Sequence, residues 1–140
     1  MLIEIDGWSF EVDEKATGDY SAAELAEHCT CGYCLNFYET VDTFYPNLRR
    51  LIQKLGIKIE APDELMPYDI GNQMYCDATY SVCGKILRCG VNPILIDGLA
   101  IQPHMSENVA LCYHCPEPYF VLRIGTIVLP WILDHSTILS

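Results

Sequence analysis

The first thirteen residues constrain the fold most, because they specify a β-hairpin together with its register. Asp6-Gly7 is typical of a two-residue type I′ turn, in which both central residues adopt positive φ. Apolar and polar residues alternate around this turn, so pairing across it places the apolar side chains on one face. That face consists of three predicted pairs: Ile5 with Trp8, Ile3 with Phe10, and Met1 with Val12.

Residues 32–43 and 46–55 each show the spacing of apolar residues that is typical of a helix with one buried face. The apolar stripes consist of Cys34, Phe37, Tyr38 and Val41 in the first segment, and Leu48, Leu51, Ile52 and Leu55 in the second. Pro46 is typical of a first helical residue, and Gly56 is typical of the position that ends a helix. We therefore predict two helices packed over a sheet.

A shorter helix is predicted over residues 22–27. Ser21 and Glu24 match a capping box, in which the serine is the N-cap and the glutamate reaches back to it. This helix would lead the chain directly to His28 and Cys29.

The rest of the chain predicts antiparallel strands at residues 74–88, 94–101, 108–113 and 119–133, with Gly125 or Pro130 bending or ending the last one. Alternation in the first of these strands places Cys76 on the buried face and Cys83 on the opposite face. Connectors and turns are expected at residues 61–63, 66–68, 71–72 and 90–93. At 140 residues, the chain is predicted to be a single α+β domain (1–140), with an N-terminal β-hairpin, two helices and then an antiparallel sheet.

A cysteine cluster at the start of the first predicted helix carries the strongest chemical signal. Cys29, Cys31 and Cys34 have the Cys-x-Cys and Cys-x-x-Cys spacings that suit a tetrahedral site for a soft metal, and zinc is the expected ion. A helix N-terminus also favours the thiolate form that binds metal. The candidates for a fourth ligand are His28, Cys83 and, if the last loop folds back, Cys112, His114 or Cys115.

Two other interpretations of the cluster stay open. Cys34 can pack in the core while nothing binds, or Cys31 and Cys34 can act as a thiol redox pair. The sequence context of a thioredoxin-like motif is missing, because a polar helical segment precedes the cysteines instead of a buried strand. Pairing with Cys112 and Cys115 would make a zinc ribbon, but 77 residues separate Cys34 from Cys112, so spacing gives no support.

The charge balance excludes some partners. The formal net charge is −11, with 8 basic and 19 acidic residues, so no basic stripe is available for a nucleic-acid backbone. No apolar run approaches the length of a transmembrane helix, and the first residues lack a signal-peptide pattern. We expect a cytoplasmic protein whose eight cysteines are mostly reduced.

Several segments together resemble a family of small uncharacterised bacterial proteins, mainly from Firmicutes. These segments are Cys29–Phe37 (Cys-Thr-Cys-x-x-Cys-x-Asn-Phe), Leu55–Ile57, Val82–Ile86 and Leu129–Asp134 (Leu-Pro-Trp-Ile-Leu-Asp). The resemblance implies a shared fold and is compatible with a shared metal site, but it implies no reaction. The pair Cys112-x-x-Cys115 lies outside the family's pattern.

The function expected from these features is that of a bacterial protein with a structural zinc site, acting through contacts with a protein partner rather than as an enzyme. A thiol-dependent or zinc-dependent enzyme is the first alternative. An immunity-protein-like or antitoxin-like partner is the second, because the chain is small and acidic. The fourth ligand distinguishes the structural zinc protein from the enzyme. Four protein ligands are typical of a structural zinc site, whereas three ligands and an open position are typical of a catalytic one.

Overall fold

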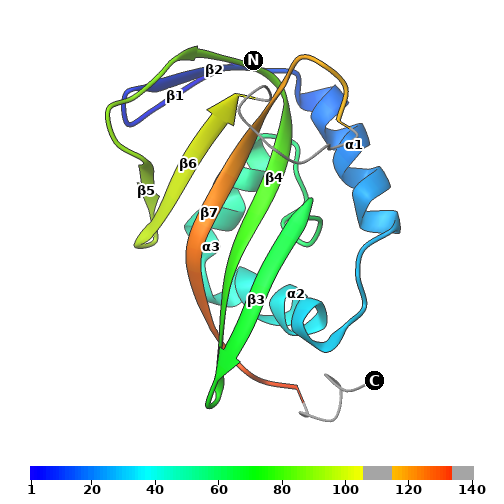
Figure 1. The fold of residues 1–140 in the computed structure, drawn as a ribbon. Helices are drawn as coiled ribbons and strands as arrows, with labels where there is room; N and C mark the ends of the chain where they lie inside the picture. Colours follow the sequence, from blue (N-terminus) through cyan, green and yellow to red (C-terminus); the bar gives the residue numbers. More distant parts are fainter. Residues whose placement is uncertain (106–114, 134–140) are drawn as a thin grey trace.

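The computed structural model describes residues 1–105 and 115–133, and within them it contains a seven-stranded antiparallel sheet and three helices (Figure 1). The helices are α1 (Glu14–Ala26), α2 (Gly32–Phe44) and α3 (Pro46–Lys54). The strands are β1 (Leu2–Ile5), β2 (Trp8–Val12), β3 (Glu64–Ile70), β4 (Gln73–Arg88), β5 (Ile94–Ile96), β6 (Leu99–Met105) and β7 (Tyr119–Pro130). The predicted α+β class, with its N-terminal hairpin and following antiparallel sheet, is confirmed.

The N-terminal hairpin has the predicted register. Ile5 pairs with Trp8 and Ile3 pairs with Phe10, and Asp6-Gly7 forms the turn with φ of 50° and 85°. The buried members of the apolar face are Ile3, Trp8, Phe10 and Val12, whereas Met1 is 41% exposed. A short turn signal with alternating side chains was therefore sufficient to specify this element.

The sheet is organised around β4, whose two edges are used differently. β7 pairs along most of one edge, while β3 and β2 share the other edge, β3 near the start of β4 and β2 near its end (Figure 1). Helix α1 lies beside the gap between them. There, the Cys83 N–H donates to Thr17 Oγ1 at 3.0 Å, and the Cys83 carbonyl accepts from the Asp13 N–H at 2.8 Å. The helix thus satisfies backbone groups that no strand reaches.

The start of α1 differs from the prediction. The helix begins at Glu14 rather than near residue 22, and its N-cap is Asp13, whose carboxylate accepts from the Ala16 N–H at 3.0 Å. Ser21 is a buried residue within the helix, and its hydroxyl accepts from the Lys58 N–H at 2.8 Å. The buried residues of α1 are the polar Thr17 and Ser21, so the helix has no apolar stripe to reveal its first turns.

Helices α2 and α3 begin and end close to where they were predicted, and they cover one face of the sheet. Their fully buried residues belong to the same core as the alternating residues of β4 and β7. The largest side chains of this core include Phe37, Leu48, Ile52, Met74, Tyr80, Phe120, Leu122, Ile124, Ile127 and Leu129. Within the described residues, no helix has both the length and the apolar character needed to cross a lipid bilayer.

One predicted connector and one predicted strand are corrected in the second half of the chain. Residues 66–68, predicted as a connector, lie in β3, where Pro67 is tolerated because β3 pairs with β4 on one side only. Residues 94–101 form two strands, β5 and β6, because Asp97-Gly98 makes a second tight turn with φ of 52° and 78°. β7 ends at Pro130 as expected, and the strand predicted at residues 108–113 lies outside the described residues.

The Asp97 side chain caps α3 from another part of the chain, so Asp97→Ala is expected to destabilise the fold. Its carboxylate accepts from the N–H groups of Asn47 and Leu48 at 2.9 and 3.1 Å. Loss of a cap of this kind costs about 1 kcal/mol. Urea unfolding at pH 7 should show this loss, with the exposed Asp19→Ala as a control.

The effect should depend on pH. Slight desolvation opposes ionisation, but the hydrogen bonds from Asn47 and Leu48 hold the pKa of Asp97 below its ordinary value. The carboxylate therefore stabilises the fold above the unfolded-state pKa, and this contribution is lost as the pH falls through the folded-state pKa. A difference between wild type and Asp97→Ala that stays constant down to pH 2 would contradict this assignment.

Candidate metal centre

The cysteine cluster lies where the loop after α1 enters α2. Cys31 is the N-cap residue of α2, with φ −67° and ψ 164°, and Cys34 lies in the first turn of that helix. The Sγ atoms of Cys29, Cys31 and Cys34 all lie within 4.8 Å of one another. Cys29 and Cys31 are exposed, whereas Cys34 is half-buried. Within residues 1–105 and 115–133, these three form the one group of His, Cys, Asp or Glu ligands that converge in this way.

Hydrogen bonds hold the loop in this conformation. The Cys31 N–H donates to Cys29 Sγ at 3.4 Å, and the Tyr38 hydroxyl donates to the Cys29 carbonyl at 2.9 Å. The Tyr38 ring also meets the ring of His28 edge to face, with centroids 5.1 Å apart. Tyr38 therefore connects the second turn of α2 to the loop that carries Cys29.

The three thiols differ in acidity. A hydrogen bond from the Cys31 backbone N–H, followed by one from the Cys31 side chain, lowers the pKa of Cys29. Burial, followed by hydrogen bonds with Cys31 and Cys29, raises the pKa of Cys34 well above its ordinary value. The cluster thus has an exposed sulfur that favours the thiolate and a half-buried one that retains its proton. A bound cation would favour release of that proton, because metal ligation selects the thiolate.

Helix α2 is clamped where the ligands project from it. Buried Asn36 donates from Nδ2 to the Pro130 carbonyl at 3.0 Å and accepts at Oδ1 from the Ile132 N–H at 2.9 Å. One turn earlier, Tyr33 donates to Asp69 Oδ1 at 2.6 Å, at the end of β3. These supporting residues were not assigned from the sequence. The signal for Asn36 was a polar side chain beside the apolar stripe of α2.

The other predicted ligands are not brought to the cluster. His28 bonds through Nδ1 to the Leu25 carbonyl and is not among the converging ligands. Cys83 lies beside Cys115, with the two sulfurs 3.5 Å apart, and its backbone contacts Thr17 near the start of α1. The cluster follows the far end of α1, so the nine residues that follow Thr17 up to Ala26, about 13 Å of helix at about 1.5 Å per residue, lie between the Cys83 contact and the cluster. Cys112 and His114 lie outside the described residues.

No family model, no curated protein and no solved structure matches this chain.

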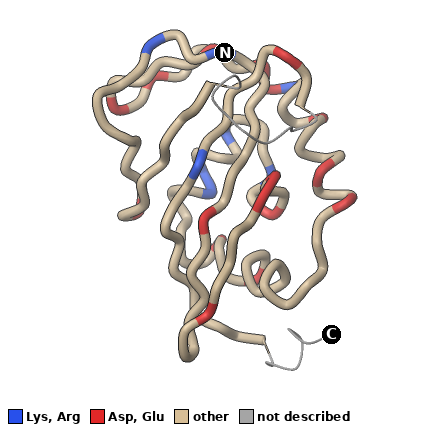
Figure 2. Tube along the Cα trace, in the orientation of Figure 1, with Lys and Arg blue, Asp and Glu red and all other residues tan. Residues whose placement is uncertain are grey.

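The charges around the site favour a cation. Figure 2 shows acidic residues along α1 and only scattered Lys and Arg, in agreement with the net charge of −11. Glu24 and Glu27 lie at the end of α1 that leads to the cluster. An acidic surface concentrates cations and repels anionic substrates such as phosphates.

Proposed function

We propose that the protein is a non-enzymatic, zinc-binding interaction module in which Cys29, Cys31 and Cys34 hold the metal as thiolates. The observation that carries this proposal is the convergence of the three sulfurs within 4.8 Å. Zn–S bonds of about 2.3 Å place the sulfurs of a tetrahedral site about 3.8 Å apart. In the structure the three sulfurs lie within 4.8 Å of one another, and rotation of the exposed Cys29 and Cys31 side chains is enough to bring them to about 3.8 Å.

Zinc would serve a structural role at this position. Its ligands would come from both the loop after α1 and the first turn of α2, so the metal would join these two helices. The fully buried residues of α1 are the polar Thr17 and Ser21, and apolar packing therefore contributes little to holding its end in place. Metal ligation would supply the missing stabilisation, because binding free energy is available to the fold.

The exposed fourth position supports an interaction role. The described residues provide three converging ligands, and two of them are exposed to solvent. A side chain from a protein partner can reach a metal there and complete the tetrahedron. We propose that this partner is met in the cytoplasm, where cysteines stay reduced and able to bind zinc. The resemblance to small Firmicutes proteins supports only a bacterial source.

The proposal is tested by metal content and thermal stability of tag-free protein purified under reducing conditions. We expect about one zinc per chain by mass spectrometry, and a fall in melting temperature of about 5–10 °C when a chelator removes it. Cys34→Ser should weaken zinc binding by about 100-fold or more. Cys89→Ser, which changes an exposed cysteine outside the cluster, should have no effect. Protein that neither contains zinc nor gains stability from added zinc would refute the site.

A zinc-dependent enzyme is the second candidate, favoured by the same three-ligand arrangement. In that case water occupies the fourth position and becomes a nucleophile. Cobalt substitution distinguishes the interaction module from the enzyme. The visible spectrum of bound Co²⁺ differs between a site of three thiolates plus water and a site completed by a fourth protein ligand. A water ligand together with hydrolysis of an activated ester, abolished by Cys34→Ser, would favour the enzyme.

A further inference from the structure

Cys83 and Cys115 form a second thiol site, separate from the metal-binding loop. Their Sγ atoms lie 3.5 Å apart in a hydrogen bond in which either thiol can be the donor. Both side chains are buried, at 4% and 6% exposure. The two residues are 32 positions apart, so their contact is created by the tertiary fold.

Backbone hydrogen bonds hold both sides of this pair. Cys83 is fixed from one side by α1, through the bonds of its N–H and carbonyl to Thr17 and Asp13. On the other side, the Gly84 N–H donates to the Pro118 carbonyl at 2.9 Å, which ties the segment after Cys115 to β4. The backbone that carries each cysteine is therefore held in place by hydrogen bonds, and this keeps the two sulfurs close together.

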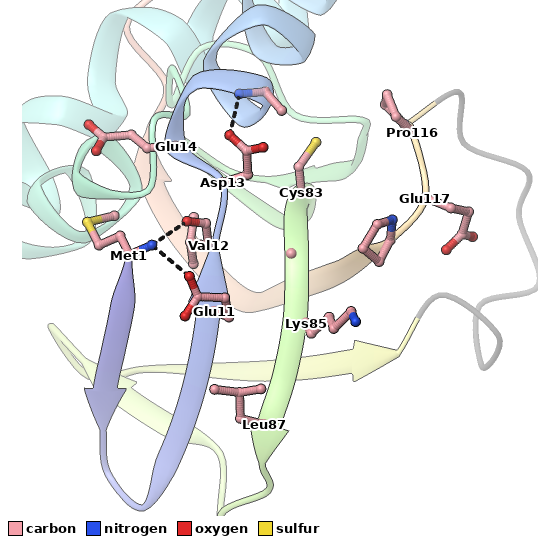
Figure 3. Close-up of a pocket in the computed structure, with 13 residues that line it drawn as sticks. Met1, Glu11, Val12, Asp13, Glu14, Cys83, Lys85, Leu87, Pro116 and Glu117 are labelled. Carbon is pink, nitrogen blue, oxygen red and sulfur yellow. Dashed lines mark hydrogen bonds and ion pairs between the residues drawn. The ribbon is translucent and has the colours of Figure 1, made fainter.

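A cavity of about 740 Å³ lies next to this pair, and Cys83 forms part of its wall. Figure 3 shows Cys83 on β4 facing the segment that carries Pro116 and Glu117, and all three residues line the cavity. Lys85 lines the same cavity. A molecule of a few heavy atoms that enters the cavity can thus come next to Cys83, whereas Cys115 does not line the cavity and contacts Cys83.

We propose that Cys83 and Cys115 are a modification site that a hydroperoxide converts into a reversible disulfide. The Cys83 thiolate attacks one oxygen of hydrogen peroxide, so that an S–O bond forms, the O–O bond breaks and hydroxide leaves. The Cys83 proton converts this hydroxide to water. The Cys115 sulfur then attacks the Cys83 sulfenic sulfur, forming the S–S bond and breaking the S–O bond. The Cys115 proton leaves with the hydroxide as a second water, so two thiols lose two electrons and peroxide gains them.

The geometry favours this second step over further oxidation. An S–S bond of about 2.05 Å requires the two sulfurs, now 3.5 Å apart, to approach by about 1.5 Å, a shift of the size that rotation of side chains produces. Burial, followed by the hydrogen bond with Cys83, raises the pKa of Cys115. Cys115 therefore resists direct oxidation by peroxide, and its proton passes to the leaving hydroxide as its sulfur attacks the sulfenic acid. The disulfide would also join the segment after residue 114 to β4 and constrain the unfolded chain.

The test treats the reduced, full-length protein with hydrogen peroxide, blocks free thiols and maps disulfides by mass spectrometry. We expect a cross-link between the peptides that contain Cys83 and Cys115, with a loss of 2 Da that dithiothreitol reverses. Closing a loop of this length should raise the melting temperature by about 5–10 °C. Protein in which the cluster cysteines are all replaced by serine should behave in the same way, which keeps this result independent of the zinc site.

Three single variants complete the design. Cys115→Ser and Cys83→Ser should each abolish both the cross-link and the peroxide-induced rise in melting temperature, and either suffices if the other fails to fold. Cys89→Ser should retain both. The proposal is overturned if Cys83 and Cys115 remain fully alkylatable after peroxide treatment, if Cys83 links to a different cysteine, or if the rise in melting temperature persists in Cys115→Ser.

Discussion

Replacing Gly84 with alanine is expected to disrupt the pairing of β2 with β4 and to lower the free energy of unfolding by about 3–5 kcal/mol. Gly84 has φ +149°, a conformation that L side chains rarely adopt. A Cβ atom there would lie 2.0 Å from the Glu11 carbonyl oxygen and 3.1 Å from the Val12 Cα. Both obstacles are backbone atoms of β2, so no side-chain rotation relieves the clash.

Gly71→Ala is a matched control for this prediction. Gly71 also has positive φ, at +63°, but nothing lies within 4 Å of a Cβ placed there. That substitution should cost only the backbone strain, about 1 kcal/mol. Urea unfolding measures both losses, and hydrogen exchange should show faster exchange of the β2 amides in Gly84→Ala alone. Equal destabilisation by the two substitutions would contradict a steric role for Gly84.

Replacing Asn36 with alanine is expected to lower the free energy of unfolding by about 2–4 kcal/mol, because two backbone groups lose their partners. The Pro130 carbonyl and the Ile132 N–H would be left unpaired where the chain passes over α2. Urea unfolding provides the measurement. Asn92→Ala changes an exposed amide and should stay within about 0.5 kcal/mol of wild type.

Asn36→Asp sharpens the same prediction, since it keeps the acceptor for Ile132 but turns a carboxylate oxygen toward the Pro130 carbonyl. Burial and that carbonyl disfavour the charged form, so the folded-state pKa of the new carboxyl should be raised. The protonated form can donate as the amide does. The stability deficit of this variant should therefore shrink as the pH falls through that raised pKa. A deficit that does not change with pH would show that the hydrogen bond to Pro130 contributes little.

Asn36 also connects the fold to the candidate metal site. If zinc binding is coupled to folding, saturating zinc should restore part of the stability that Asn36→Ala loses, by about 2.7 kcal/mol at a free zinc concentration of 100 times Kd. The same addition should not rescue a variant that lacks Cys34. This comparison separates loss of the clamp on α2 from loss of the ligands themselves.

The sequence predicted the parts of the fold that depend on neighbouring residues, such as tight turns and helices with an apolar stripe. Asp6-Gly7 specified the hairpin, and the apolar stripe around Phe37 and Val41 specified α2. The Asp97-Gly98 turn carries the same signal as Asp6-Gly7, so the division between β5 and β6 was also readable. The early start of α1 was not, because Thr17 and Ser21 face backbone groups of distant residues and show no apolar period.

The cysteines also divide into a group that the sequence predicted and a pair that it did not. Cysteine spacing predicted the group formed by Cys29, Cys31 and Cys34, since ligands within one loop and one helical turn are held together by local geometry. The encounter of Cys83 with Cys115 depends on the pairing of β4 with β7, in which Cys83 lies opposite Tyr119. That pairing is a tertiary property, and no spacing in the sequence indicates it.

The position of β7 in the chain has a consequence for how the protein is made. β7 lies between β4 and β6 and contributes much of the core, yet it is the last strand of the described residues to be synthesised. The cysteine cluster leaves the ribosome about 100 residues before the end of β7, which corresponds to about 5–20 s of translation. During that interval the three thiols are present on a nascent chain whose sheet is incomplete. Zinc that binds at this stage would join the ends of α1 and α2 before β7, the strand to which Asn36 anchors α2, has been made.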